Sequence, residues 1–244
     1  MPSDGSVLVR DATVGDVDGI ATLHADSWRL HYRGAFSDAF LDGDVLADRL
    51  AVWSARMARP PAGCTVVAVE ATTGAIVGFA HAVFDEDPDW GTLVDNLHVG
   101  HRAKRRGIGS VLMAETARRV LRHDPAGRLY LWVLEQNVDA QRFYRALGGS
   151  IVERRPAVGP GGVPGRLVGT PVALRCAWRD PSRLLWEQKA PGPPPAPPCH
   201  EPPGPGPPEP GPPGPGPPGP GPGSGGPGGP WPGPAWSVVP SDRP

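Results

Sequence analysis

The sequence contains little cysteine: only three of its 244 residues are Cys. Their number is odd, and they lie far apart, at Cys64, Cys176 and Cys199. They lack the close spacing of a metal-binding cluster. Because small secreted domains depend on paired cysteines, this pattern favours a reducing compartment. We therefore expect a cytoplasmic protein without a disulfide framework and without a metal site.

Long apolar runs are also missing. A membrane-spanning helix needs about 20 consecutive apolar residues, and no window of the sequence approaches that. The opening MPSDGSVLVRDATVGD does not have the basic and then apolar pattern of a secretory signal. We expect neither a membrane segment nor a leader.

An excess of charge of either sign is absent as well, since the formal net charge is -1. A nearly neutral chain has no overall attraction for nucleic acid or for an anionic membrane. Any site for an anion must therefore be local.

Proline and glycine, by contrast, are abundant at one end of the chain. Of the 54 residues from Pro191 onward, 25 are proline and 14 are glycine. The glycines do not recur at every third position, which excludes a collagen helix. This composition predicts a disordered, partly polyproline-II tail over 191–244, after a domain over 1–180 and a linker over 181–190. Its PxxP spacings are compatible with a weak protein contact, and a solvated tail is the simpler interpretation.

Hydrophobic periodicity predicts alternating strands and helices before the tail. Strands are expected at 6–13, in two runs about a turn within 64–87, and at 90–99, 127–136, 150–158 and 170–178. Helices are expected at 16–33, 37–58, 107–124 and 137–149. Hairpins joined to one central strand–loop–helix–strand crossover predict a single α/β domain with a mixed, mostly antiparallel sheet flanked by about four helices.

The most informative stretch is HRAKRRGIGS, residues 101–110, between a predicted strand and the strongest predicted helix. A helix N-terminus presents unpaired N–H groups and a positive dipole end, and Gly107 and Gly109 would let an anion approach the backbone. The basic residues nearby would add charge. The pattern of a P-loop is absent, and Leu112 stands where a dinucleotide fingerprint has its third glycine. The loop therefore predicts a phosphate site, with a plain basic turn as the alternative.

Together with LYLWVLEQNVDAQRFYRALGG, residues 129–149, this loop resembles the GCN5-related N-acetyltransferase (GNAT) family. Lys104-Arg105-Arg106-Gly107-Ile108-Gly109 stands where that family has [Q/R]-x-x-G-x-[G/A], with Lys in place of the usual Gln or Arg. The resemblance spans roughly residues 6–179. It implies acetyl-CoA as a co-substrate and two strands that separate around its pantetheine arm. The residues implied to bind it are the backbone of Leu97, His98 and Val99, then Lys104, Arg105, Arg106, Gly107, Ile108, Gly109 and Ser110, and Asn137.

The same resemblance implies two roles on the helix that begins at Asn137. Asn137, Ala140 and Tyr144 share one helical face. Asn137 would bind the cofactor, and Tyr144 would protonate the leaving thiolate. An ordinary N-cap and a core aromatic remain the alternative interpretations.

The general base is less defined by the sequence. Asp95 is the first candidate, because it precedes Leu97 by two residues and should share its face of the strand, opposite His98. Glu135 is the second candidate, and His81 and His98 are the remaining titratable groups nearby. Trp28 and Tyr32 are expected in the acceptor pocket or in the core.

These patterns predict an acetyltransferase acting on a primary amine of a small molecule or peptide by direct attack, as a monomer or homodimer. The alternative is a catalytically weak acyl-CoA-binding module that docks partners through its tail. Nucleic-acid binding through residues 102–106 is disfavoured, because the basic cluster is short and lacks interleaved aromatic residues. LGG at 147–149, in place of LGF, and a Gly/Pro-rich connection before residue 172 bear on the choice of acceptor.

Overall fold

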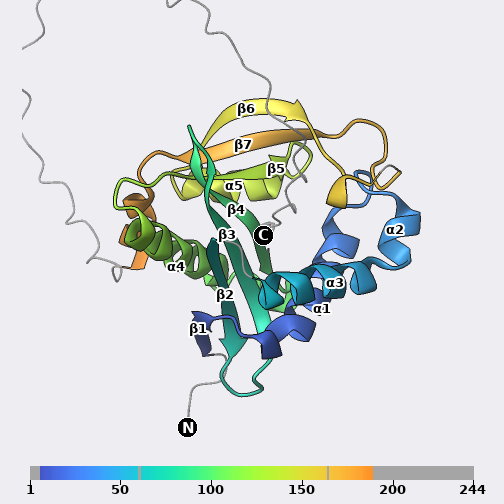
Figure 1. Cartoon of the computed structure of the whole chain (residues 1–244), viewed down its shortest axis with the longest axis horizontal. Coiled ribbons are helices and arrows are strands. Elements are labelled where there is room, and N and C mark those ends of the chain that lie inside the picture. Colours follow the sequence, from blue (N-terminus) through green and yellow to red (C-terminus); the bar gives the residue numbers. More distant parts are fainter. Residues whose placement is uncertain (1–5, 60–61, 164, 189–244) are drawn as a thin grey trace, which may run out of the picture. The chain divides into compact units, whose positions relative to one another are not determined.

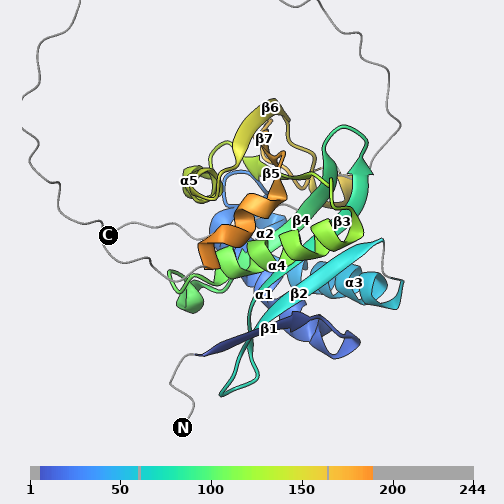
Figure 2. The same cartoon turned by 90° about the vertical axis from the view of Figure 1, so that its left-hand side faces the viewer.

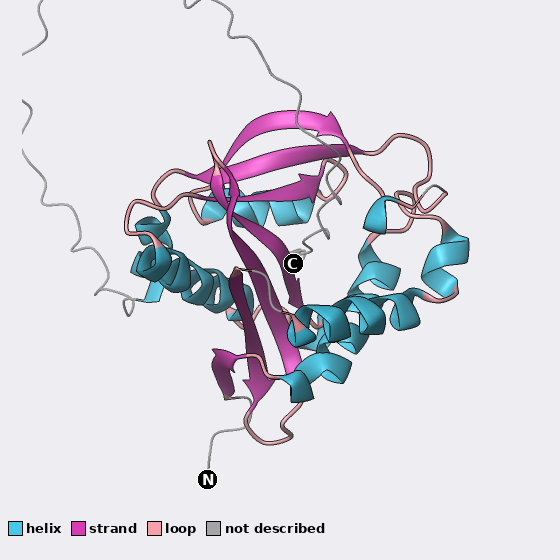
Figure 3. Ribbon diagram, viewed as in Figure 1, coloured by secondary structure: helices cyan, strands magenta, loops and turns pink. Residues whose placement is uncertain are grey.

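The computed structural model describes residues 6–59, 62–163 and 165–188, and these form a seven-stranded mixed sheet with helices on both faces (Figures 1 and 3). The strand order is β1-β2-β3-β4-β5-β7-β6, and only the β4–β5 pair is parallel. The predicted mixed, mostly antiparallel α/β sheet is therefore confirmed. The predicted tail at 191–244 lies outside the described residues.

The elements follow the predicted order. The strands are β1 (Val7–Asp11), β2 (Gly63–Glu70), β3 (Ile76–Asp87), β4 (Gly91–Val99), β5 (Leu129–Leu134), β6 (Ser150–Pro156) and β7 (Val172–Trp178). The α-helices are α1 (Val17–His31), α2 (Asp38–Asp42), α3 (Val45–Ala58), α4 (Ile108–His123) and α5 (Val138–Ala146). Short 3-10 helices are η1 (Val14–Asp16), η2 (His101–Ala103), η3 (Pro160–Gly162) and η4 (Pro181–Gln188).

Successive side chains along a strand point to opposite faces of the sheet, so a strand can contribute to two buried layers. Val66 and Ala68 of β2 join the buried cluster beneath α4 and α5, whereas Val67 and Val69 pack toward α1 and α3. The same division continues along β5, where Leu131 lies in the α4 and α5 cluster and Trp132 lies with the residues of α1. Figure 2 shows α4 crossing the sheet on the face opposite α1 and α3.

The predicted helix over 37–58 is divided into α2 and α3. Gly43 ends α2 with φ -93° and ψ -121°, which is not helical. A Cβ at Gly43 would lie 2.7 Å from the carbonyl oxygen of Ala39, so this turn accepts no larger residue without moving. The described residues consequently contain five α-helices instead of about four.

Residues 181–188 differ from the expected linker. They form η4, and Leu184 is buried in the cluster beneath α4. Asp180 starts this helix by accepting a hydrogen bond from the backbone N–H of Ser182 (3.1 Å). The apolar pair Leu184–Leu185 therefore adds a short element to the domain.

Candidate active site

The site is centred on the place where β4 and β5 separate. The parallel pairing of the two strands covers only Thr92 with Leu129 and Leu93 with Tyr130. The rest of β4, from Val94 to Val99, no longer pairs with β5. The family resemblance implied such a separation, and we call the region beyond Leu93 and Tyr130, where the two strands part, the passage.

A β-bulge in β4 lies at the start of this passage. His81 of β3 aligns with Asn96 and Ala82 aligns with Val94, so Asp95 is the additional residue. Asp95 and Asn96 therefore face the same way, and both accept hydrogen bonds from Arg56 of α3, at 2.5 Å and 3.1 Å. Leu97 packs beneath α4. The expectation that Asp95 shares the face of Leu97 is wrong, because the bulge interrupts the alternation.

The loop after β4 forms a cradle at the N-terminus of α4. Gly107 precedes the helix with φ +72°, and no atom lies within 4 Å of where its Cβ would be. Arg105 also has a positive φ of 59°. No side chain caps the helix, and its first backbone bond joins the Val111 N–H to the Gly107 carbonyl. The preceding N–H groups are thus available to an anion.

A cavity of about 300 Å³ lies over this helix start. It is lined by Val99, Ala103, Arg105, Gly107, Ile108, Gly109, Ser110 and Phe143. The structure therefore brings together six of the residues predicted to bind the cofactor.

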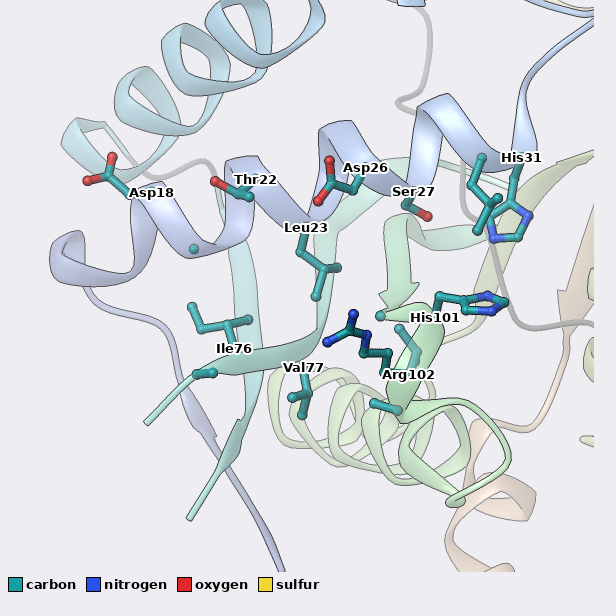
Figure 4. Close-up of a pocket in the computed structure, with 16 residues that line it drawn as sticks. Asp18, Thr22, Leu23, Asp26, Ser27, His31, Ile76, Val77, His101 and Arg102 are labelled. Carbon is teal, nitrogen blue, oxygen red and sulfur yellow. The ribbon is translucent and has the colours of Figure 1, made fainter. Parts of the chain in front are cut away.

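The basic side chains of the loop diverge. Only Arg105 lines the cradle. The ammonium of Lys104 lies 3.1 Å from Nε2 of His31, at the end of α1, and Arg106 lies 3.9 Å from Glu70. Arg102 reaches into a second cavity of about 610 Å³, between α1 and the ends of β3 and β4 (Figure 4).

Asn137 and Tyr144 are both on α5, as predicted. The Asn137 side-chain oxygen accepts a hydrogen bond from the Ala140 N–H at 3.1 Å, so its predicted capping role is confirmed. Tyr144 is fully buried and packs edge-on against Phe143 and Trp178.

Tyr32 belongs to the other face of the sheet but lies near Tyr144 of this helix. Burial raises the pKa of Tyr32 well above its usual value, and the neighbouring Tyr144 and Asp95 raise it further. Tyr144 belongs to the cluster beneath α4 and α5, whereas Tyr32 belongs to the cluster of α1. Tyr144, from the opposite layer, therefore lies close enough to Tyr32 to raise its pKa.

The candidate bases occupy different environments. Asp95 is only 4% exposed, whereas Glu135 is exposed and forms two 2.8 Å hydrogen bonds with Arg154. Those bonds lower the pKa of Glu135. Arg56 holds Asp95 in a similar way, so burial is what distinguishes the two carboxylates. Burial lowers the pKa of His81 to about 4. His98 is buried and its Nδ1 lies 3.0 Å from Ser27 Oγ of α1.

Two kinds of feature are absent from the part of the chain that the structure describes. It contains no group of three or more side chains arranged to hold a metal ion. Among the same residues, no helix has the length and apolar character needed to cross a membrane.

Two features of the site escaped sequence reasoning. Arg56 holds the carboxylate of Asp95 from 39 positions away in the sequence. His31 contacts Lys104 across 73 positions. Neither residue belongs to a local motif, so only the packing of α1 and α3 on the sheet reveals these contacts.

Comparison with known proteins points to one family. The model of the acetyltransferase (GNAT) family matches residues 22–148. The uncharacterized N-acetyltransferase YuaI of Bacillus subtilis (strain 168) is 26% identical over 133 residues, which is 54% of this chain and 73% of that protein.

Solved structures share the fold. A putative acetyltransferase, yncA, from Salmonella typhimurium, determined with its cofactor acetyl-CoA, aligns with a TM-score of 0.51 at 20% identity, over 77% of this chain and 98% of that one. The PaiA N-acetyltransferase of Thermoplasma acidophilum, in complex with coenzyme A, gives a TM-score of 0.52 at 15% identity, over 71% and 99% of the two chains.

The contact between His31 and Lys104 predicts an unusual titration. Burial, then the charges of Lys104 and His101, lower the pKa of His31 to about 4, while Asp139 acts in the opposite direction. Because the unfolded chain binds this proton near pH 6.5, the contribution of His31 to stability is complete above that pH and is lost as the pH falls toward 4.

Histidine NMR titration checks this prediction, with Lys104→Gln as the perturbation and His31→Gln to assign the signal. Lys104→Gln should raise the pKa of His31 while leaving it below 6.5, since burial remains the larger cause. An unchanged pKa in Lys104→Gln would contradict the contact.

Proposed function

The chain belongs to the acetyltransferase (GNAT) family, and from this premise we propose that it transfers the acetyl group of acetyl-CoA to a primary amine of a small molecule or peptide by direct attack. The observation that carries the proposal is the separation of β4 from β5 beyond Leu93, on the strand that leads to the uncapped N-terminus of α4. A thioester arm needs such a passage, and a diphosphate needs such a helix end.

Acetyl-CoA is proposed to occupy the passage and the cradle. Its pantetheine arm lies along the backbone of Leu97, His98 and Val99, near Asn137. Its diphosphate lies over the loop from Lys104 to Ser110. The N–H groups of that loop carry most of the contact, because Lys104 is directed toward His31 and Arg106 toward Glu70.

The reaction needs a neutral amine and a protonated leaving group. The amine nitrogen attacks the thioester carbonyl carbon, and its proton passes through a water molecule to Asp95. The carbon–sulfur bond then breaks, and the hydroxyl of Tyr144 donates its proton to the sulfur. Both side chains are buried. Electrostatic interactions are stronger where bulk water is excluded, and this supports both proton-transfer roles.

The cradle predicts that substitutions of Arg105 and of Arg102 change acetyl-CoA binding to different extents. Arg105→Ala should weaken acetyl-CoA binding about five- to tenfold, the loss expected for one partly solvated ion pair. Arg102→Ala is the matched control, since Arg102 lines the other cavity (Figure 4). Isothermal titration calorimetry at two salt concentrations measures both variants. Equal losses in the two would mean that only the overall charge of the loop acts.

Release of free CoA thiol tests the proposed reaction directly. Purified protein with acetyl-CoA is screened against amines, aminoglycosides, amino acids and peptide N-termini. Thiol release with at least one amine is expected. Binding of acetyl-CoA without release from any amine would instead favour the acyl-CoA-binding module.

Tyr144→Phe should lower kcat about a hundredfold in this assay, because the leaving thiolate loses its proton donor. The dissociation constant of acetyl-CoA should change little. Tyr130→Phe makes the same change in a buried tyrosine on the paired part of β5 and should leave kcat nearly unaltered. Parallel losses of turnover and binding in Tyr144→Phe would assign that residue to packing alone.

Asp95→Asn should lower kcat about a hundredfold at neutral pH and progressively less at higher pH, where more of the amine is already neutral. Glu135→Gln, which removes the exposed carboxylate, should have little effect. The pH profile of kcat measures both. A loss in Asp95→Asn that stays constant with pH would identify Asp95 as a structural partner of Arg56.

A further inference from the structure

Arginines stacked on aromatic rings surround the side of the passage that faces α1 and α3. The guanidinium of Arg49 lies 4.2 Å from the ring centre of Trp28. Arg155 of β6 lies 3.7 Å from the ring centre of Trp132, and Arg175 of β7 lies 4.7 Å from the same centre. Trp28 and Trp132 belong to one buried cluster, which also contains Tyr32.

This cluster adjoins the proposed reaction centre. Trp132 follows Tyr130, the last residue of β5 that pairs with β4, so it lies on the separated part of the strand. Tyr144 and Asp95 both raise the pKa of Tyr32, so they lie near this cluster. An acceptor that approaches through this layer would therefore meet Trp132 and the guanidinium above it.

Carboxylates pair with the other arginines packed on aromatic rings in this layer. Arg49 and Arg166 pair with Asp48, Arg56 pairs with Asp95, and Arg175 pairs with Asp87 and Glu153. The group around Asp48 carries a formal charge of +1, and the group around Arg175 carries -1.

Arg155 is the exception. It is half-buried, and its guanidinium makes no hydrogen bond and no ion pair with any residue that the structure describes. The nearby carboxylates of Glu153 and Asp87 are already held by Arg175. Partial burial lowers the pKa of Arg155, because the charged form has lost part of its water. The charges of Glu153 and Asp87 act on Arg155 without direct contact. The N–H donors of this partly desolvated guanidinium therefore have no acceptor, and an anionic ligand would supply one.

We infer that Arg155 binds a carboxylate of the acceptor, and that the acceptor is a small molecule carrying both an amine and a carboxylate, as amino acids do. The inference rests on the proposed acetyl transfer. Trp132 covers one face of the guanidinium, which leaves the N–H donors in its plane for a bidentate bond with a carboxylate. The same arrangement disfavours diamines, since a second ammonium would face a cation.

Matched pairs of amines that differ only in the carboxylate test this inference. Suitable pairs are phenylalanine with phenethylamine, lysine with cadaverine, and ornithine with putrescine. Wild-type protein should show a kcat/KM roughly ten- to a hundredfold higher for the carboxylate-bearing member of a pair it accepts, as expected for one charge-assisted bidentate contact. The difference should lie mainly in KM.

Arg155→Gln should abolish that preference while leaving the affinity for acetyl-CoA unchanged. Arg155→Lys keeps the charge without the planar fork and should retain only part of the preference. Arg154→Gln is the matched control, because Arg154 is the neighbouring arginine on the same strand and pairs with Glu135. It should behave as wild type. Thermal melting of each variant identifies any loss that comes from unfolding.

A preference that survives in a folded Arg155→Gln, or a wild-type preference for the amine without the carboxylate, would overturn the inference. Binding of N-acetylphenylalanine and of N-acetylphenethylamine in the presence of CoA gives a second measurement that needs no turnover. If no amine releases thiol, yet Arg155 is needed for the tighter binding of N-acetylphenylalanine, the proposed reaction fails and the carboxylate site stands. If that binding is independent of Arg155, the carboxylate site fails by itself.

Discussion

The separation of β4 from β5 is the constraint on which the rest of the site depends. The two strands pair only at Thr92 and Leu93 of β4, and the extra residue at Asp95 then alters the direction of side chains along β4. A continuous sheet would isolate the two helical layers from each other. Where the strands separate, Tyr144 from one layer lies close enough to Tyr32 from the other to raise its pKa. The cradle at Gly107 lies at the end of the strand that forms one side of this passage.

The features predicted correctly from the sequence are those determined by neighbouring residues. Alternating apolar residues predicted the strands, Asn137 was predicted as a helix cap, and the glycines of the loop marked the start of a helix. Each of these depends on a few consecutive positions. The face of Asp95 was predicted wrongly, because a bulge adds one residue to a strand without a distinct sequence pattern. The direction of Lys104 was equally hidden, since it depends on the distant His31.

The two sides of the passage differ in whether their residues come from one short segment or from several distant elements. Residues 97–110 supply most of the proposed cofactor side, so that side is contained in one short segment of the chain. The other side combines Tyr32 of α1, Arg56 of α3, Trp132 of β5 and Arg155 of β6. Their contacts join segments far apart in the sequence, and changes in α1, in α3 or in the connection before β7 can alter that side without affecting the cradle. A conserved fold can thus keep one cofactor while its acceptor changes.

The two sides also use charge differently. At the cradle, backbone N–H groups and the dipole of α4 supply the positive field, and the adjacent arginines and lysine largely point elsewhere. Such a field fits a diphosphate and requires no particular side chain. On the proposed acceptor side, four of the arginines stacked on rings pair with carboxylates, so the proposed preference depends on the remaining N–H donors of Arg155. Under that proposal, a single substitution of Arg155 would change which amines are accepted and would leave the residues of the cradle in place.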